Sequence, residues 1–175
     1  MFIYTSATKD SSGAKIGGVG FFVSPQAYCS IDFIKSEGCL RILHMQLSGD
    51  KDTKKQKTFK TNFVNVYSPT ATKKADAEVV TLYQDLQKVV SDIPIGHLAI
   101  TLGDFNAQLY KQFANIKFSP NKTSNRNSES LLGCYQHNFL QEKREINYLF
   151  RMQEAQSFRE EVYQKESLFG LYACQ

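Results

Sequence analysis

A helical repeat of apolar residues between two apolar strands constrains the fold of this chain more than any other feature. From Lys73 to Ile93 apolar residues recur at helical spacing, acidic residues stand in the first turns, and Pro94 follows the end. The sequence therefore predicts a helix over 73–93. Its inward positions are Val79, Leu82, Tyr83, Leu86, Val89, Val90 and Ile93.

Strand patterns surround this helix. The segment TNFVNVYSP (61–69) precedes it and LAITLGDFNAQL (98–109) follows it. Upstream, the segments IGGVGFFVS (16–24), AYCSIDFI (27–34) and CLRILHMQL (39–47) predict three further strands. A second, short helix is predicted from about Ser128 to Leu140, with Leu131, Leu132, Tyr135 and Phe139 inward. This order of elements indicates a layered α/β arrangement.

In two of these predicted strands, the side chains divide into two different faces. In 61–69, Phe63, Asn65 and Tyr67 share one face while Val64 and Val66 share the other. In 39–47, Arg41 shares a face with Leu43, Met45 and Leu47, opposite Leu40, Ile42 and His44. The stretch between them, SGDKDTKKQKTFK (48–60), carries five lysines. It is either a solvated hairpin loop or a basic loop that faces phosphate.

Composition limits the class of protein. With 175 residues, of which 42% are hydrophobic, the chain suits one globular domain. A formal net charge of +4 is compatible with a polyanionic partner but does not require one. The four cysteines form no CxxC pair, and no apolar run approaches the roughly 18 residues that span a bilayer. We therefore expect an intracellular protein that is neither secreted nor bound to a membrane.

The end of the last predicted strand carries an acid and an amide, Asp104 and Asn106. Because side chains alternate along a strand, both project to one side while Phe105 turns to the other, and Gly103 permits an unusual backbone path. A carboxylate there can orient or deprotonate water, and an amide can donate to a phosphoryl oxygen. The alternative is that both residues only end the strand and form a turn.

Several motifs occur in the same order and approximate spacing as in the endonuclease/exonuclease/phosphatase superfamily. They are GGVGFFVSP (17–25), VNVYSPT (64–70), LAITLGDFNAQL (98–109) and NRNSESLLGCYQHNFL (125–140). The chain most resembles the apurinic-type endonuclease domain of non-LTR retrotransposons and the related craniofacial-development-protein-2-like sequences. The resemblance covers roughly residues 1–140.

The resemblance implies a fold, a reaction and a site. The fold is an α/β (α+β) four-layered sandwich of two mixed β-sheets flanked by helices, and the reaction is metal-dependent hydrolysis of a phosphodiester in DNA. Asp104 would activate the attacking water, Asn106 would hold that water or a phosphate oxygen, and Tyr67 would contact the scissile phosphate. Asp104 and Asn106 would also bind the cofactor, magnesium or manganese. The alternative for Tyr67 is a ring that packs in the core.

The chain departs from the family pattern at both ends. The family's asparagine strand and the strand with its metal-binding glutamate are expected before residue 1, and 141–175 lacks the family's Asn-x-x-Asp-Tyr and Ser-Asp-His signatures. We therefore expect a partial domain over 1–140, incomplete at both ends, and a charged amphipathic helical tail over 141–175. His44, His97 and His137 are expected to be solvated or packed rather than to replace the family's histidine.

These departures predict an endonuclease of retrotransposon origin with weak or no activity as this chain. A non-catalytic nucleic-acid-binding remnant is the first alternative. Hydrolysis of a phosphoinositide or a nucleotide is the second.

Overall fold

The largest element of the fold is a five-stranded mixed sheet. The computed structural model describes residues 1–9, 13, 15–37, 40–52, 57–70, 76–108, 124–136, 146–150 and 171–174. The sheet contains, in spatial order, β5 (Ile31–Glu37), β6 (Ile42–Asp52), β7 (Lys57–Tyr67), β8 (Leu98–Asp104) and β9 (Ile146–Phe150). Strands β5 to β7 pair antiparallel, whereas β8 runs parallel to both β7 and β9.

A second, smaller sheet is antiparallel rather than mixed. It contains β1 (Phe2–Tyr4), β4 (Gly20–Val23) and β10 (Leu171–Cys174), with β4 in the centre. The short strands β2 (Thr8–Lys9) and β3 (Lys15–Ile16) form a separate two-stranded pair.

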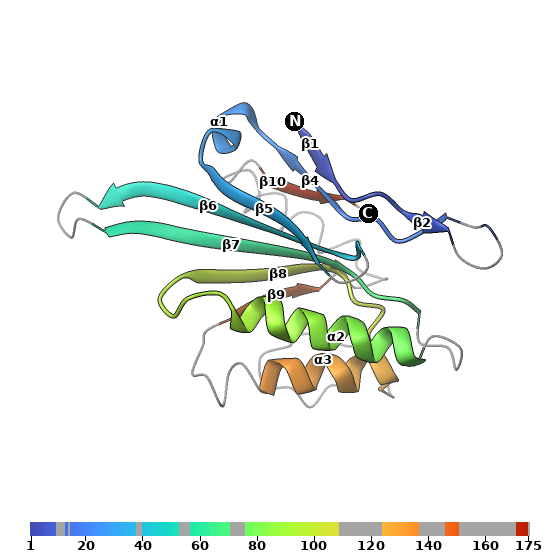
Figure 1. Ribbon diagram of the computed structural model, residues 1–175. Coiled ribbons are helices and arrows are strands. Elements are labelled where there is room, and N and C mark those ends of the chain that lie inside the picture. The colour runs from blue at the N-terminus through green and yellow to red at the C-terminus, as the bar shows by residue number, and fades with distance from the viewer. Residues whose placement is uncertain are drawn as a thin grey trace, which may run out of the picture.

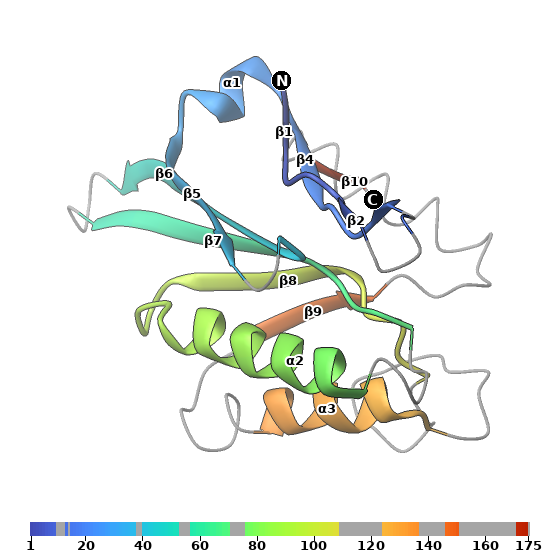
Figure 2. The ribbon, with the colours of Figure 1, turned by 45° about the vertical axis from the view of Figure 1, so that its right-hand side comes forward.

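The elements are stacked in layers. Helices α2 (Asp76–Ser91) and α3 (Arg126–Gln136) lie against one face of the five-stranded sheet, and the three-stranded sheet lies on its other side (Figures 1 and 2). This arrangement confirms the α/β class and the pair of sheets predicted above. In the described part of the chain, neither helix has the length and apolar character needed to cross a bilayer.

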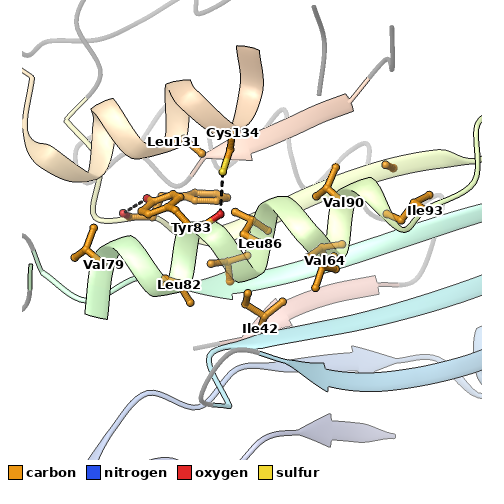
Figure 3. Close-up of a cluster of buried hydrophobic side chains, with 14 residues drawn as sticks. Ile42, Val64, Val79, Leu82, Tyr83, Leu86, Val90, Ile93, Leu131 and Cys134 are labelled. Carbon is orange, nitrogen blue, oxygen red and sulfur yellow. Dashed lines mark hydrogen bonds between the residues drawn. The ribbon is translucent and has the colours of Figure 1, made fainter. Parts of the chain in front are cut away.

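The helix-side core is formed by one face of the sheet and by α2. All seven predicted inward positions of the helix are buried, and they pack with Ile42, Val64 and Val66 (Figure 3). From α3, Leu131 and Cys134 join this cluster, and the Cys134 thiol contacts the Tyr83 carbonyl at 3.1 Å (Figure 3). Tyr135 and Phe139, also predicted to point inward, have side chains outside the described part of the chain.

The inter-sheet core uses the opposite face of the same strands. Leu43, Met45 and Phe63 pack against Phe21 and Val23 of β4 and against Val19, which directly precedes β4. The Asn65 side chain crosses the same interface, because its Nδ2 donates to the Gly20 carbonyl at 2.7 Å. The two faces predicted for these strands are therefore confirmed over 42–47 and 63–67. Cys39 lies outside the described residues, and Leu40 and Arg41 precede β6.

Three local predictions are wrong in whole or in part. Ala27 and Tyr28 lie in a short helix, α1 (Pro25–Tyr28), because Ser24 Oγ accepts the Ala27 N–H at 3.1 Å and Pro25 stands in the first turn. The hairpin predicted over 48–60 is confirmed, but the loop is shorter than expected, since β6 continues to Asp52 and β7 starts at Lys57.

The third error is the helical tail expected over 141–175, at the two segments of it that the structure describes; 141–145, 151–170 and 175 lie outside the described residues. Residues Ile146–Phe150 form β9, and Leu171–Cys174 form β10. Both strands pair with partners from the first 140 residues, so each completes a sheet rather than forming an appendage. A strand beside β8 gains the backbone hydrogen bonds of a ready sheet edge, which outweighs weak helical periodicity.

A cluster of polar side chains joins three strands of the five-stranded sheet. We expect its contribution to the stability of the fold to be lost in acid. The Asp32 carboxylate accepts hydrogen bonds from Gln46 (2.8 Å), Ser48 (2.6 Å) and Lys60 (2.5 Å). The Lys60 hydrogen bond is the largest of the effects that lower the pKa of Asp32 from 3.8 to about 2. Because the folded pKa lies below the unfolded one, this stabilisation is present above about pH 4 and is lost as the pH falls toward 2.

We expect Asp32→Asn to lower the free energy of unfolding at pH 7 by no more than about 1 kcal/mol, since the cluster is partly exposed and water screens it. At pH 2 the variant and the wild type should be nearly equal. Urea unfolding at both pH values measures this, and an equal gap at both would contradict the assignment.

Candidate functional site

The first two predicted site residues lie next to each other. In the parallel pair β7–β8, Tyr67 stands opposite Asp104, and both residues end their strands. Tyr67 packs at the margin of the inter-sheet core, as do Ile100 and Leu102 of β8. Asp104 stands beside Tyr67 at the end of the neighbouring strand, at the margin of the inter-sheet core. We call this edge the mouth between the two sheets.

Asn106 joins the same edge through the chain that follows β8. Its backbone has a left-handed φ of 47°, and its N–H donates to Asp104 Oδ1 at 3.0 Å. Its Nδ2 donates to the Ser68 carbonyl at 2.6 Å, which ties this loop to the residue after Tyr67. Asp104 and Asn106 thus end the strand and form a turn, as the alternative reading of these residues predicted. The same turn also brings them beside Tyr67.

Arg41, which directly precedes β6, also lies at this edge, although the sequence motifs did not indicate it. The β6–β7 register continues so that Arg41 stands opposite Tyr67, and the Tyr67 N–H donates to the Arg41 carbonyl at 3.0 Å. The guanidinium carbon lies 6.0 Å from the centroid of the Tyr67 ring. The available signal was a cation on a strand face that is otherwise apolar. Arg41, Tyr67 and Asp104 therefore form a row across three strands.

Asn127 of α3 fixes the two loops that carry the site. Its side chain is fully buried, and its Nδ2 lies within hydrogen-bonding distance of the Pro69 carbonyl (2.8 Å), the Phe105 carbonyl (3.1 Å) and Ser68 Oγ (3.2 Å). The Tyr83 hydroxyl also donates to the Phe105 carbonyl at 3.1 Å, and burial raises the pKa of this tyrosine. Asn127 thus connects the loop after β7 to the loop after β8.

Asn125, just before α3, holds the Asn106 loop. Its Nδ2 donates to the Asn106 carbonyl at 2.8 Å, and its Oδ1 accepts the backbone N–H groups of Ser128 (3.0 Å) and Gln108 (3.2 Å). Ser128 Oγ in turn donates to the Gln108 carbonyl at 2.6 Å. The segment 125–128 therefore caps the helix and anchors the site loop together.

The histidines do not join this edge within the described residues. His44 is buried on the helix side, where its Nε2 lies 3.0 Å from Asn62 Oδ1, and burial lowers its pKa. His97 precedes β8, at the strand end opposite Asp104. His137 lies outside the described residues. The packing role predicted for His44 is confirmed.

The magnesium or manganese ion implied by the resemblance needs oxygen ligands. The edge offers the carboxylate of Asp104, one oxygen of which already accepts the Asn106 N–H, and the amide of Asn106, which is tied to Ser68. No three or more His, Cys, Asp or Glu side chains of the described residues are grouped to hold a metal. This donor set does not fit a resident divalent ion.

The chain matches no protein-family model, no curated protein and no solved structure.

Proposed function

We propose that this chain binds the phosphodiester backbone of DNA at the edge formed by Tyr67 and Asp104, as a member of the endonuclease/exonuclease/phosphatase superfamily with weak or no hydrolytic activity. One observation carries the proposal. Tyr67 and Asp104, taken from separate motifs of the resemblance, stand in register at the ends of adjacent parallel strands.

The chemistry of the edge supports binding of a phosphate group. The guanidinium of Arg41 supplies charge, and the hydroxyl of Tyr67 can donate to a phosphate oxygen. The hydrogen bonds from Asn106, Asn125 and Asn127 fix the loops beforehand, so little conformational entropy is lost when a ligand binds. The net charge of +4 favours a polyanion over a neutral partner.

Hydrolysis has less support, because attack at phosphorus needs more than a positioned water. Negative charge develops on the phosphoryl oxygens, and a metal ion or a ring of donors must stabilise it. Asp104 is the one carboxylate of the row formed with Arg41 and Tyr67, and neither described histidine lies at this edge. Loss of a single transition-state contact commonly lowers the rate by about 10²–10³.

We therefore predict little or no nicking of DNA. Supercoiled plasmid incubated with the protein and magnesium should yield only a faint band of nicked circle, equally faint with Asp104→Ala. Asp92→Ala, which removes an exposed carboxylate just after α2, serves as the matched control. Robust nicking by the wild type and by Asp92→Ala that disappears in Asp104→Ala would contradict weak activity and show a working hydrolase.

A further inference from the structure

Arg41 has hydrogen-bonding capacity that the described residues do not use. Its side chain is 11% exposed, and its Nη1 atom is buried with no hydrogen-bond partner among those residues. Its Nη2 donates to Glu78 Oε2 of α2 at 3.2 Å, and the Glu78 side chain is 64% exposed. A guanidinium carries five N–H donors, so one exposed carboxylate leaves much of this buried cation unsatisfied.

The surroundings of Arg41 hold its stem in place. A Cβ added to Gly17 would lie 3.5 Å from Arg41 Cγ, so the Gly17 backbone passes close beside the side chain. The centroid of the Tyr67 ring lies 6.0 Å from the guanidinium carbon. Arg41 thus has close neighbours at both its stem and its head, and Glu78 is the partner that can leave, because its side chain is 64% exposed and can turn to water.

We propose that Arg41 binds a phosphate group at the mouth between the two sheets, and that Glu78 occupies the guanidinium until the phosphate displaces it. This inference rests on the proposed function and names its phosphate-binding residue. Guanidinium and phosphate match in planar, two-point geometry, and their hydrogen bonds are stronger than those of a single lysine ammonium.

The charges along the edge favour a phosphate at Arg41 over one at Asp104. Asp104 lies two strands from Arg41, and neighbouring strands are about 4.8 Å apart. The backbones of Arg41 and Asp104 are therefore about 10 Å apart, a separation at which water and salt weaken the repulsion between Asp104 and a phosphate on Arg41.

The test is a titration of the full chain with inorganic phosphate at constant ionic strength, followed by the NMR signals of the Arg41 side chain and of the Tyr67 amide. We expect Arg41→Gln to weaken phosphate binding about tenfold. Glu78→Gln removes the competitor and should strengthen binding about twofold to fivefold. Both variants are compared with the wild type by circular dichroism.

The chain provides matched controls. Lys88 and Asp92 are exposed at the C-terminal end of α2, the end opposite Glu78, so Lys88→Gln and Asp92→Asn repeat both charge changes away from the mouth. Neither should alter phosphate binding by more than about twofold. If Lys88→Gln weakens binding as much as Arg41→Gln does, general charge explains the effect and the proposal is overturned.

Arg41→Lys keeps the charge and guards against a failure of Arg41→Gln to fold. We expect it to weaken phosphate binding at least threefold, because the ammonium lacks the two-point geometry. Binding equal to that of the wild type in this variant would overturn the proposal. If phosphate binds through Arg41 but a DNA duplex does not bind, the phosphate site stands and the proposed function fails. If a DNA duplex binds the wild type and the Arg41 variants with equal affinity, the proposed function stands and the phosphate site at Arg41 fails.

Discussion

Replacing Gly103 with alanine is expected to unfold the protein or to lower its free energy of unfolding by at least about 3 kcal/mol. Gly103 has a backbone φ of 131°, which residues other than glycine rarely adopt. An added Cβ would lie 2.0 Å from the Val66 carbonyl oxygen and 2.9 Å from Asn65 Oδ1. These atoms belong to the neighbouring parallel strand, so the two strands would have to separate just before Tyr67 and Asp104.

A second glycine provides the control for this prediction. Gly133 lies in α3, and an added Cβ there would meet no atom of the described residues within 4 Å. Gly133→Ala should raise the free energy of unfolding by up to about 1 kcal/mol, because alanine favours the helix. Thermal and urea unfolding of both variants measure the difference. Equal stability of the two variants would contradict the close approach of β7 and β8 at Gly103.

Asn127→Ala is expected to lower the free energy of unfolding by about 2–3 kcal/mol. The substitution leaves the carbonyls of Pro69 and Phe105 and the hydroxyl of Ser68 without this donor in a buried position. Part of the loss is offset, because Asn127 Oδ1 has no hydrogen-bond partner among the described residues. The Phe105 carbonyl keeps its hydrogen bond from the Tyr83 hydroxyl, so the cost comes mainly from the Pro69 carbonyl and the Ser68 hydroxyl.

The neighbouring Glu129→Ala gives the matched comparison for Asn127→Ala. Glu129 is exposed in the first turn of the same helix, so its replacement should change stability by no more than about 0.5 kcal/mol. Urea unfolding compares the two, and hydrogen exchange of the Asn106 amide shows whether the loop opens. A cost below about 0.5 kcal/mol for Asn127→Ala would show that this residue does not hold the site loops.

Local patterns predicted the parts of the fold in which burial alternates regularly. The helix-side residues of α2 and the two faces of β6 and β7 follow directly from periodicity, because each element buries a defined face. The meeting of Tyr67 and Asp104 followed from the resemblance of VYSPT and GDFNA. Its physical basis, the parallel register of β7 and β8, is a long-range property that no single segment contains.

Other features depend on partners far along the chain. Residues Ile146–Phe150 look helical by themselves but pair with β8, and Ala27 follows the Ser24 cap rather than its own strand propensity. The part played by Asn127 was not predictable, since nothing local to NRNSE shows that its amide reaches Pro69 and Phe105. Arg41 could have been noticed as a cation on an apolar strand face.

The most direct measurement of the central claim is an NMR titration of the full chain with a short DNA duplex, without magnesium. We predict that the backbone amides of residues 41, 67–68 and 103–106 shift together, with the affinity falling as salt rises. The lysine-rich segment 48–60 should change less. An absence of shifts at Tyr67, Asp104 and Asn106, with changes confined to 48–60, would contradict a phosphodiester-binding site at this edge of the sheet.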